Sequence, residues 1–522
     1  MLPLDRRTLL GLGAAAAVVP GDAAGAARAP CVRTRGGILA GYSDTGVSVF
    51  KGIPYGADTG PRRFQAPVPP KPWRGVREAV AHGPASPQAR PPEAASEDCL
   101  CLNVWTPGLD GGKRPVMVYI HGGAYSSGSG SDPLYDGRRL AARGEVVVVT
   151  LNHRLSALGY LYLSRFDRRF PDSGNAGQLD LVLALRWVRD NIAAFGGDPG
   201  RVMLFGQSGG GAKIATLMAM PAARGLFHRA ATMSGQQLTA SGPLNATRRT
   251  RAFLDALGVA PGRAGELATM PVERLTEALS TVDPVIGSGG LYFGPVLDER
   301  SLTRHPFYPD APPLSADIPM IIGNTRDETR YFMGRSDPTT WSLGWDELPA
   351  RLIPQMRVDI DPETVVATYR SLYPHYSPTE VYFAATTASR SWRAAIVEAE
   401  LRAAQGSPAF VYQLDWRSPK DGGKWGAPHT LDIPLVFGTL DAPDSITGTD
   451  ARARAMSDLM MDAFIAFARA GDPNHDGLPA WEPYDLERRR TMVFDDATRM
   501  EDDPRGAERR LFEKVPFIQQ GT

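Results

Sequence analysis

Cysteine is scarce in this chain. Only three cysteines occur among 522 residues, at Cys31, Cys99 and Cys101. An odd number leaves at least one free thiol, so at most one disulfide can form. No Cys-x-x-Cys pair and no His/Cys cluster indicates a set of metal ligands. Stability is therefore expected to come from a buried apolar core, and neither a metal nor another cofactor is expected.

The chain also lacks an excess of either charge and lacks long apolar runs. Lys and Arg together number 57, as do Asp and Glu, so the formal net charge is zero. This balance argues against a nucleic-acid partner and against a polybasic membrane patch. No stretch is apolar enough for stable insertion into a membrane. Hydrophobic residues make up 43% of the chain, which is ample for a large core.

The first residues have the pattern of a targeting segment. Arg6-Arg7 precedes Leu9-Leu10, an Ala-rich stretch follows, and Ala24-Gly25-Ala26 offers a small-residue cleavage site. Paired arginines in this setting resemble a bacterial twin-arginine signal. We expect residues 1–29 to be such a signal, read by the twin-arginine export machinery, and the protein to be periplasmic or extracellular. The alternative is a basic tail with no targeting role.

Apolar runs typical of buried strands alternate with helical segments through the rest of the chain. Several runs are apolar throughout, as expected when helices cover both faces of a parallel sheet. The pattern predicts an α/β fold with a mainly parallel central sheet flanked by helices, as a single domain over residues 30–522. The candidate strands are residues 116–120, 146–151, 202–205, 230–233, 320–322, 410–414 and 492–494, and the clearest helix is 178–195.

Two further segments, residues 260–300 and 337–378, read as helical insertions. Insertions in such folds usually lie over the C-terminal edge of the sheet, where active sites are found. We therefore expect these segments to surround the functional site.

The most informative motif is Gly206-Gln207-Ser208-Gly209-Gly210. It follows a candidate strand and precedes a helix-compatible run, which is the pattern of a nucleophile elbow. The turn is so tight that side chains two residues to either side of the serine would collide, so glycine is needed there. The motif predicts an exposed, nucleophilic Ser208. The alternative is a glycine-rich turn with a solvated serine.

A serine nucleophile also needs N–H donors for the oxyanion, a base and a carboxylate. His121-Gly122-Gly123-Ala124-Tyr125 follows a strand and can supply converging N–H groups. His429 is the best candidate base, because it lies in a Gly/Pro loop after the nucleophile. The acid should follow a strand between Ser208 and His429, and either Asp327 or Glu328 meets that requirement.

Several ordered motifs together resemble the type-B carboxylesterase/lipase family, which includes bacterial para-nitrobenzyl esterases, and the match covers nearly the whole mature chain. The resemblance implies an α/β-hydrolase fold with its helical insertions over the C-terminal edge of the sheet. The matching motifs are Phe50-Lys51-Gly52-Ile53-Pro54-Tyr55, Ser96-Glu97-Asp98-Cys99-Leu100, Phe195-Gly196-Gly197-Asp198-Pro199 and Gly471-Asp472-Pro473-Asn474, with the elbow between them.

The same resemblance assigns roles residue by residue. It implies Ser208 as nucleophile, Glu328 rather than Asp327 as the acid, and His429 as the base. The oxyanion donors would be the N–H groups of Gly123, Ala124 and Gly209, and Ser234 would lie close to the acid and base. A core serine with no such role is the alternative for Ser234.

The chain departs from the family pattern at four positions. The family usually has Glu where Gln207 stands, and the loss of that anion is expected to lower the pKa of His429. It usually has Ala at Gly209 and a third glycine at Ala124, whose methyl is expected to narrow the site. Ser86 stands where the family often has a cysteine that pairs with the position of Cys99, so Cys99 is expected to be a buried free thiol.

These observations predict a serine carboxylesterase that cleaves small-molecule esters through an acyl-enzyme on Ser208. A non-catalytic adhesion protein on the same fold and a lipase with an interfacial lid are the alternatives. A nucleotide site is not expected, because Lys213 does not directly follow the glycine as a P-loop requires. The calcium-loop-like segment at 472–483 ends in Pro483, where a bidentate Glu is needed.

Overall fold

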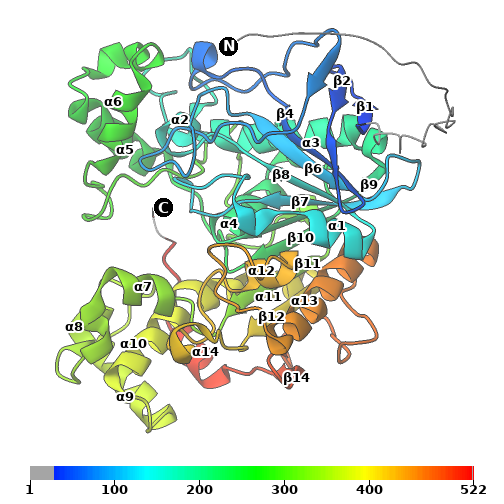
Figure 1. Cartoon of the computed structure of the whole chain (residues 1–522). Coiled ribbons are helices and arrows are strands. Elements are labelled where there is room, and N and C mark those ends of the chain that lie inside the picture. The colour runs from blue at the N-terminus through cyan, green and yellow to red at the C-terminus, as the bar shows by residue number, and fades with distance from the viewer. Residues whose placement is uncertain (1–28, 520, 522) are drawn as a thin grey trace, which may run out of the picture.

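A large mixed sheet of eleven strands forms the centre of the molecule (Figure 1). The structure is a computed structural model that describes residues 29–519 and 521. In spatial order the strands are β14 (Arg499–Asp502), β13 (Arg490–Phe494), β12 (Ala409–Leu414), β11 (Met320–Thr325), β10 (Arg229–Met233), β9 (Gly197–Gln207), β7 (Arg114–Ile120), β8 (Val147–Leu151), β6 (Cys101–Thr106), β4 (Val47–Pro54) and β3 (Tyr42–Asp44).

The centre of this sheet is parallel and its edges are antiparallel. The pairs from β8 through β7, β9, β10, β11 and β12 to β13 are all parallel. The pairs β3–β4, β4–β6, β6–β8 and β13–β14 are antiparallel. The predicted α/β class with a mainly parallel sheet is confirmed, and all seven candidate strands lie in the sheet. A separate small sheet contains β1 (Cys31–Arg33), β2 (Ile38–Ala40) and β5 (Val76–Glu78).

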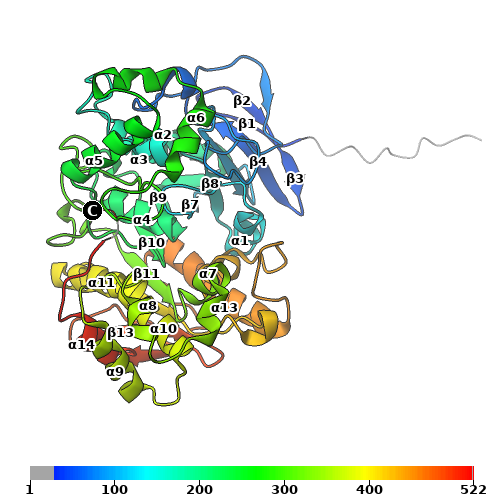
Figure 2. The same ribbon diagram turned by 90° about the vertical axis from the view of Figure 1, so that its left-hand side faces the viewer.

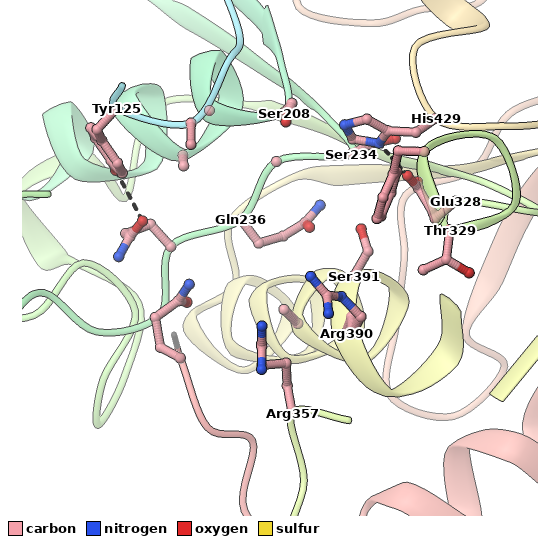
Figure 3. A pocket seen from close by; sticks show the side chains of 18 of the residues that line it. Tyr125, Ser208, Ser234, Gln236, Glu328, Thr329, Arg357, Arg390, Ser391 and His429 are labelled. Carbon is pink, nitrogen blue, oxygen red and sulfur yellow. Dashed lines mark hydrogen bonds and ion pairs between the residues drawn. The ribbon is translucent and has the colours of Figure 1, made fainter. Parts of the chain in front are cut away.

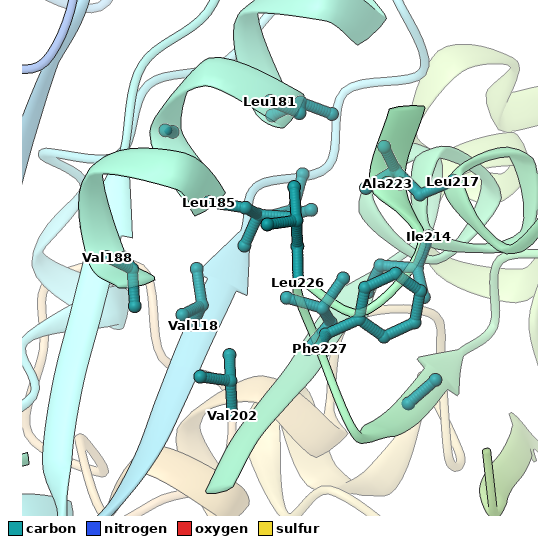
Figure 4. Packing of buried hydrophobic residues seen from close by; sticks show 14 of the residues in the cluster. Val118, Leu181, Leu185, Val188, Val202, Ile214, Leu217, Ala223, Leu226 and Phe227 are labelled. Atoms are coloured by element: carbon teal, nitrogen blue, oxygen red, sulfur yellow. The ribbon is translucent and has the colours of Figure 1, made fainter. Parts of the chain in front are cut away.

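Helices cover both faces of the sheet because alternate side chains of the central strands point to opposite sides. Val116, Val118 and Ile120 of β7 belong to one apolar cluster with residues of α3 (Ala176–Asn191), α4 (Gly209–Met218) and α11 (Arg393–Gln405). Figure 4 shows Val118 with residues of α3 and α4 from this cluster. Met117 and Tyr119 point the other way, toward α1 (Arg138–Gly144), α12 (Asp432–Phe437) and α13 (Ala451–Ala470).

The predicted helix over 178–195 is present with two adjustments. The α-helix α3 spans Ala176–Asn191, and its last predicted turn, Ile192–Phe195, is a 3₁₀ helix. Gly196 then takes a left-handed conformation with φ of 77°, which ends the helix.

The remaining helices gather in two groups beside the sheet (Figure 2). One group contains α2 (Ser156–Tyr160), α5 (Pro243–Ala256) and α6 (Val272–Glu277). The other contains α7 (Arg330–Ser336), α8 (Leu348–Leu352), α9 (Pro362–Leu372) and α10 (Pro378–Thr387), with α14 (Gly506–Phe512) packed against it. The segments predicted as insertions at 260–300 and 337–378 belong to these groups, and the first is built mainly of 3₁₀ turns and loops.

No helix within residues 29–519 is long and apolar enough to cross a membrane. The same residues contain no cluster of three or more His, Cys, Asp or Glu side chains suited to holding a metal ion. The predicted export signal at residues 1–29 lies almost entirely outside the described residues.

Candidate active site

Ser208 occupies a strained turn between β9 and α4. Its φ of 56° and ψ of −125° lie outside the regions that L-residues normally adopt. A Cβ on Gly206 would lie 2.7 Å from the carbonyl oxygen of Ile120, and a Cβ on Gly210 would overlap that same oxygen. Glycine is therefore required two residues before and two residues after the serine, because any side chain at these positions would collide with neighbouring atoms, as the motif predicts.

Glu328 and His429 are joined by a short hydrogen bond. The Glu328 Oε2 atom lies 2.5 Å from His429 Nδ1. The second carboxylate oxygen accepts hydrogen bonds from the backbone N–H of Thr325 at 2.8 Å and from the Asn324 amide at 3.0 Å. These bonds fix the carboxylate, and the carboxylate fixes the orientation of the imidazole.

The pKa values of the two groups move in opposite directions. Burial opposes ionisation of Glu328, but the neighbouring His429 and the hydrogen bonds lower the pKa of this carboxyl below its ordinary value. Burial disfavours the imidazolium of His429, yet the charge and hydrogen bond of Glu328 raise its pKa above the ordinary 6.5. The imidazole is therefore prepared to receive a proton.

Ser208 and His429 face the same cavity, as Figure 3 shows. No hydrogen bond joins their side chains in the described part of the chain; such bonds often tighten only when substrate is bound. Because Glu328 holds Nδ1 of His429, the Nε2 atom is the nitrogen left to act as a base.

Gln207 lies directly against the imidazole. Its Nε2 atom is 3.1 Å from His429 Nε2 and 3.3 Å from His429 Nδ1. Because the Gln207 nitrogen is nearly equidistant from both ring nitrogens of His429, it lies over the face of the imidazole and does not point along the lone pair of either nitrogen. The amide therefore occupies the place beside the base where the family pattern has a carboxylate, and adds no charge there.

The glycine-rich turn after β7 approaches the elbow closely. Gly123 has a φ of 79° and Ala124 a φ of 52°, both in the left-handed region. A Cβ on Gly209 would overlap the backbone of Ala124, which also lines the cavity. As the first residue of α4, Gly209 has an N–H with no partner inside the helix. The structure thus brings Gly123, Ala124 and Gly209 together beside Ser208.

A buried lysine supports this turn, a role that the sequence analysis did not predict. Lys213 Nζ donates to the carbonyl oxygen of His121 at 3.0 Å and lies over the Tyr125 ring, 5.6 Å from its centroid. Burial lowers the pKa of this lysine to about 7. A charged residue within the predicted apolar helix after an elbow is the only sequence signal that could have singled it out.

Asp327 and Glu328, the two candidate acids, make different contacts. Asp327 Oδ2 accepts a hydrogen bond from the backbone N–H of Ala427 at 2.9 Å, so it holds the loop that leads to His429. Glu328 alone contacts the imidazole. Ser234, at the end of β10, has a φ of 51° and lies beside Glu328, whose pKa its hydroxyl helps to lower.

Three other histidines that follow Ser208 in the chain, His305, His375 and His475, have structural contacts. His305 Nδ1 accepts from the N–H of Ala240, and His475 Nδ1 accepts from the N–H of Gly477. His375 packs edge-on against the neighbouring Tyr376. None of these three lines the cavity that contains Ser208.

The cavity has a volume of about 440 Å³ and is bounded by both helical groups. Tyr292 comes from the first insertion, and Phe332 lies on α7 of the second group. Two arginines, Arg357 and Arg390, line the side away from Ser208 (Figure 3). The cavity is large enough for a small organic ester, and Ser208 is the serine at the elbow within it.

Comparison with known proteins places this site in context. Residues 28–512 match the model of the Carboxylesterase family. The chain is 36% identical over 496 residues to the para-nitrobenzyl esterase of Bacillus subtilis (strain 168), which covers 92% of this chain and 97% of that protein. It is 35% identical over 490 residues to the phenmedipham hydrolase of Pseudarthrobacter oxydans, with coverage of 90% and 95%.

Solved structures give the same result. Carboxylesterase EST55 of Geobacillus stearothermophilus superposes with a TM-score of 0.83 at 39% identity, covering 92% of this chain and 99% of that one. A structure named PNB esterase superposes with a TM-score of 0.78 at 37% identity over the same shares.

Proposed function

The chain belongs to the carboxylesterase family and hydrolyses carboxylic esters, and from this premise we propose that it does so through an acyl-enzyme on Ser208. The observation that carries the proposal is the 2.5 Å contact between Glu328 Oε2 and His429 Nδ1, in a cavity that His429 shares with the strained Ser208. No cofactor takes part in this chemistry.

In the first step the Ser208 hydroxyl attacks the ester carbonyl carbon while His429 Nε2 accepts its proton. A C–O bond forms, and the carbonyl electron pair moves onto oxygen. That oxyanion is stabilised by the N–H groups of Gly123, Ala124 and Gly209, each by about 3–4 kcal/mol. Glu328 stabilises the imidazolium that forms.

Collapse of this intermediate breaks the ester C–O bond, and His429 gives its proton to the departing alcohol. Water then attacks the acyl-enzyme, with His429 again accepting the proton. The second intermediate releases the carboxylic acid and restores the Ser208 hydroxyl. One ester and one water thus yield one acid and one alcohol.

The test uses p-nitrophenyl esters from acetate to palmitate with the wild-type protein and Ser208→Ala. We expect Ser208→Ala to lose at least about a thousandfold in kcat, because the residual rate comes only from binding and the oxyanion donors. Ser280→Ala, at an exposed serine outside the cavity, is the matched control and should keep the wild-type rate. Undiminished hydrolysis by Ser208→Ala would refute the mechanism.

The same panel separates an esterase from a lipase. We propose an esterase, because the cavity volume of about 440 Å³ suits a small ester better than a long acyl chain. Rates should then fall as the chain lengthens toward palmitate. A sharp rise in rate above the micelle threshold with long chains would instead indicate a lipase with an interfacial lid.

We also propose that the precursor is exported by the twin-arginine route, which rests on Arg6-Arg7 and the Ala-rich stretch after it. In a host with this machinery, the Arg6→Lys, Arg7→Lys double variant should leave esterase activity inside the cells. The Arg33→Lys, Arg35→Lys double variant, beyond the predicted signal, is the control and should be exported normally. Equal export of both variants would contradict the proposal.

A further inference from the structure

Lys213 is a fully buried lysine that forms no ion pair with a carboxylate of the described residues. It lies on α4, the helix that begins directly after Ser208. Its Nζ atom donates to the carbonyl oxygen of His121, and its other close contact is the face of the Tyr125 ring. Tyr125 in turn lines the cavity, as Figure 3 shows. A positive charge is therefore held beside the active site by a carbonyl dipole and an aromatic ring.

The charge of Lys213 is costly for the folded protein. A buried ammonium group loses its water, and without an anion nearby that loss is not repaid. Burial accordingly lowers the pKa of Lys213 to about 7. A neutral donor at the same place would hold the His121 carbonyl without this cost. The hydrogen bond alone therefore does not explain why the donor is a lysine.

The lysine contacts the turn that carries the oxyanion donors. Its acceptor, the His121 carbonyl, lies at the start of that turn, two residues before Gly123. The turn also contacts the nucleophile, because a Cβ on Gly122 would lie 3.4 Å from the Cβ of Ser208. Charges in a protein interior interact more strongly than in water, because screening there is weak. An oxyanion formed at Ser208 would thus supply the negative charge that this ammonium group lacks.

The other titratable groups that face Lys213 do not change charge near neutral pH. The rings of His121 and His153 stack with their centroids 4.8 Å apart. Burial and the charge of Lys213 lower the pKa of His121 to about 3 and that of His153 well below 6.5. Burial raises the pKa of Tyr125 well above 10. From α3 the uncharged amide of Gln178 donates to the backbone oxygen of Lys213. Within this cluster, Lys213 is therefore the group that titrates near pH 7.

We propose that the positive charge of Lys213 stabilises the oxyanion formed at Ser208, acting through the turn that follows β7. Full activity then requires a protonated Lys213 together with a neutral His429. Lys213 acts through this turn and touches no reacting atom, so it is a positioning residue. This inference rests on the proposed acyl-enzyme mechanism and adds to it a charge behind the oxyanion donors.

The test compares the wild-type protein with Lys213→Met between pH 6 and 9.5. Methionine has a similar length and no charge. The measured quantities are kcat and kcat/KM for p-nitrophenyl acetate, corrected for spontaneous hydrolysis. At each pH the result is expressed as the ratio of the wild-type value to the variant value. The titration of His429 affects both proteins alike, so it cancels in this ratio.

We expect the ratio to be about tenfold or more at pH 6 and to fall severalfold by pH 9.5. The wild-type lysine loses its charge as the pH rises through its pKa, and the advantage over methionine is lost with it. The ratios for kcat and for kcat/KM should agree, with KM little changed, because the oxyanion forms only during reaction. A neutral lysine can still donate to His121, so a purely structural role would give a ratio that does not change with pH.

Two further variants serve as controls. Lys213→Arg keeps its charge over the whole range, so the ratio of its rate to that of Lys213→Met should stay constant with pH. Lys71→Met, at an exposed lysine outside the cavity, should match the wild-type rate at every pH.

A ratio of wild type to Lys213→Met that stays constant from pH 6 to 9.5 would overturn the proposal. If Lys213→Met does not fold, the ratio of wild type to Lys213→Arg decides in the same way, because it should also fall as the pH rises. Failure of the mechanism itself would look different. Ser208→Ala would then hydrolyse p-nitrophenyl acetate undiminished, whereas failure of this inference alone leaves Ser208→Ala inactive.

Discussion

At the scale of single residues, Gln207 determines the electrostatics beside the base. Its amide is 3.1 Å from His429 Nε2 and carries no charge. We expect Gln207→Glu to place an anion there, stabilise the imidazolium and raise the pKa of His429. Because the base must be neutral to accept the serine proton, the acid limb of the kcat/KM profile should move to higher pH.

The measurement is kcat/KM for p-nitrophenyl acetate between pH 4.5 and 9. Gln207→Met, similar in size and uncharged, separates the effect of charge from loss of the amide and should shift the limb less. An acid limb at the wild-type position in Gln207→Glu would show that the contact does not tune the base. Glu328 keeps the pKa of His429 above its ordinary value. The comparison of wild type with Gln207→Glu tests the separate expectation that this pKa is lower with Gln than with Glu at position 207.

Gly209 is expected to tolerate no side chain, although the family pattern has alanine there. A Cβ at this position would overlap the backbone of Ala124, so the turn would have to withdraw from Ser208. We expect Gly209→Ala to lower kcat by about a hundredfold, which corresponds to the loss of an oxyanion donor. Gly262→Ala, in open space, is the control. A near-normal kcat in Gly209→Ala would mean that the turn can adjust without cost.

The sequence could predict the positions of single residues where these depend on local spacing. Ser208 could be located because its turn requires glycines two residues away on each side. His429 could be selected by chain order. Spacing alone left Asp327 and Glu328 open, since they are adjacent; the family resemblance implied Glu328, which is the one of the two that contacts His429. Arg390 could not be predicted, because its place depends on contacts between segments far apart in the chain, such as Asn324 with Ser391.

At the scale of helices and strands, the C-terminal helix α14 holds the second helical group in place. Glu508 on this helix accepts hydrogen bonds from Tyr369 at 2.6 Å and Tyr373 at 2.7 Å, and it pairs with the buried Arg505. Arg505 in turn lies over the ring of Trp392, on the same π-helical turn, Ala388–Trp392, as Arg390. The cavity wall therefore depends on a buried ion pair outside the cavity.

Removing the charge of Glu508 should destabilise the protein strongly. Glu508→Gln leaves Arg505 buried without its partner, which costs about 3–5 kcal/mol of the free energy of unfolding. The measurement is urea denaturation at pH 7. Glu513→Gln, which breaks the more exposed pair with Arg509, should cost no more than about 1 kcal/mol. Equal losses in the two variants would contradict a special role for the buried pair.

The stabilisation by the Glu508–Arg505 pair should depend on pH with a definite sign. Burial opposes ionisation of Glu508, but the charge of Arg505 lowers its pKa below the unfolded value near 4.5. The stabilisation is therefore complete above that unfolded pKa and is lost as the pH falls through the lower folded pKa. The Glu508→Gln variant has no carboxylate at this position, so its free energy of unfolding should not show the decrease at low pH that protonation of Glu508 causes.

The sequence predicted the parallel centre of the sheet better than its antiparallel edges. The antiparallel strands β4 and β6 were not among the candidate strands although they are largely buried, because polar residues interrupt their apolar runs. Every candidate strand was an apolar run in the covered part of the sheet, where periodicity is a strong signal. The edge strands β3 and β14 were missed because they are short and largely exposed, and their residues are mostly polar or charged. The register of these strands is set by their neighbours rather than by a pattern of their own.

At the scale of the whole molecule, stability does not depend on disulfides within the described residues. Cys31 is exposed on β1, while Cys99 and Cys101 are buried, and all three thiols are free. Cys101 opens β6 and Cys99 lies just before it. The Ser86 hydroxyl lies beside the Cys99 thiol, so the structure agrees with the expectation that no disulfide forms there.

The three thiols should therefore react very differently in the folded protein. Burial raises the pKa of Cys101 to about 12 and raises that of Cys99 further, so neither forms a thiolate near neutral pH. We expect one thiol per chain to react promptly with Ellman's reagent at pH 8, and three after unfolding in guanidinium chloride. Cys31→Ser should remove the prompt reaction, and dithiothreitol should leave the melting temperature unchanged. Two prompt thiols in the native protein would show that the layer over β6 opens readily, whereas a melting temperature lowered by dithiothreitol would reveal a disulfide that contributes to stability.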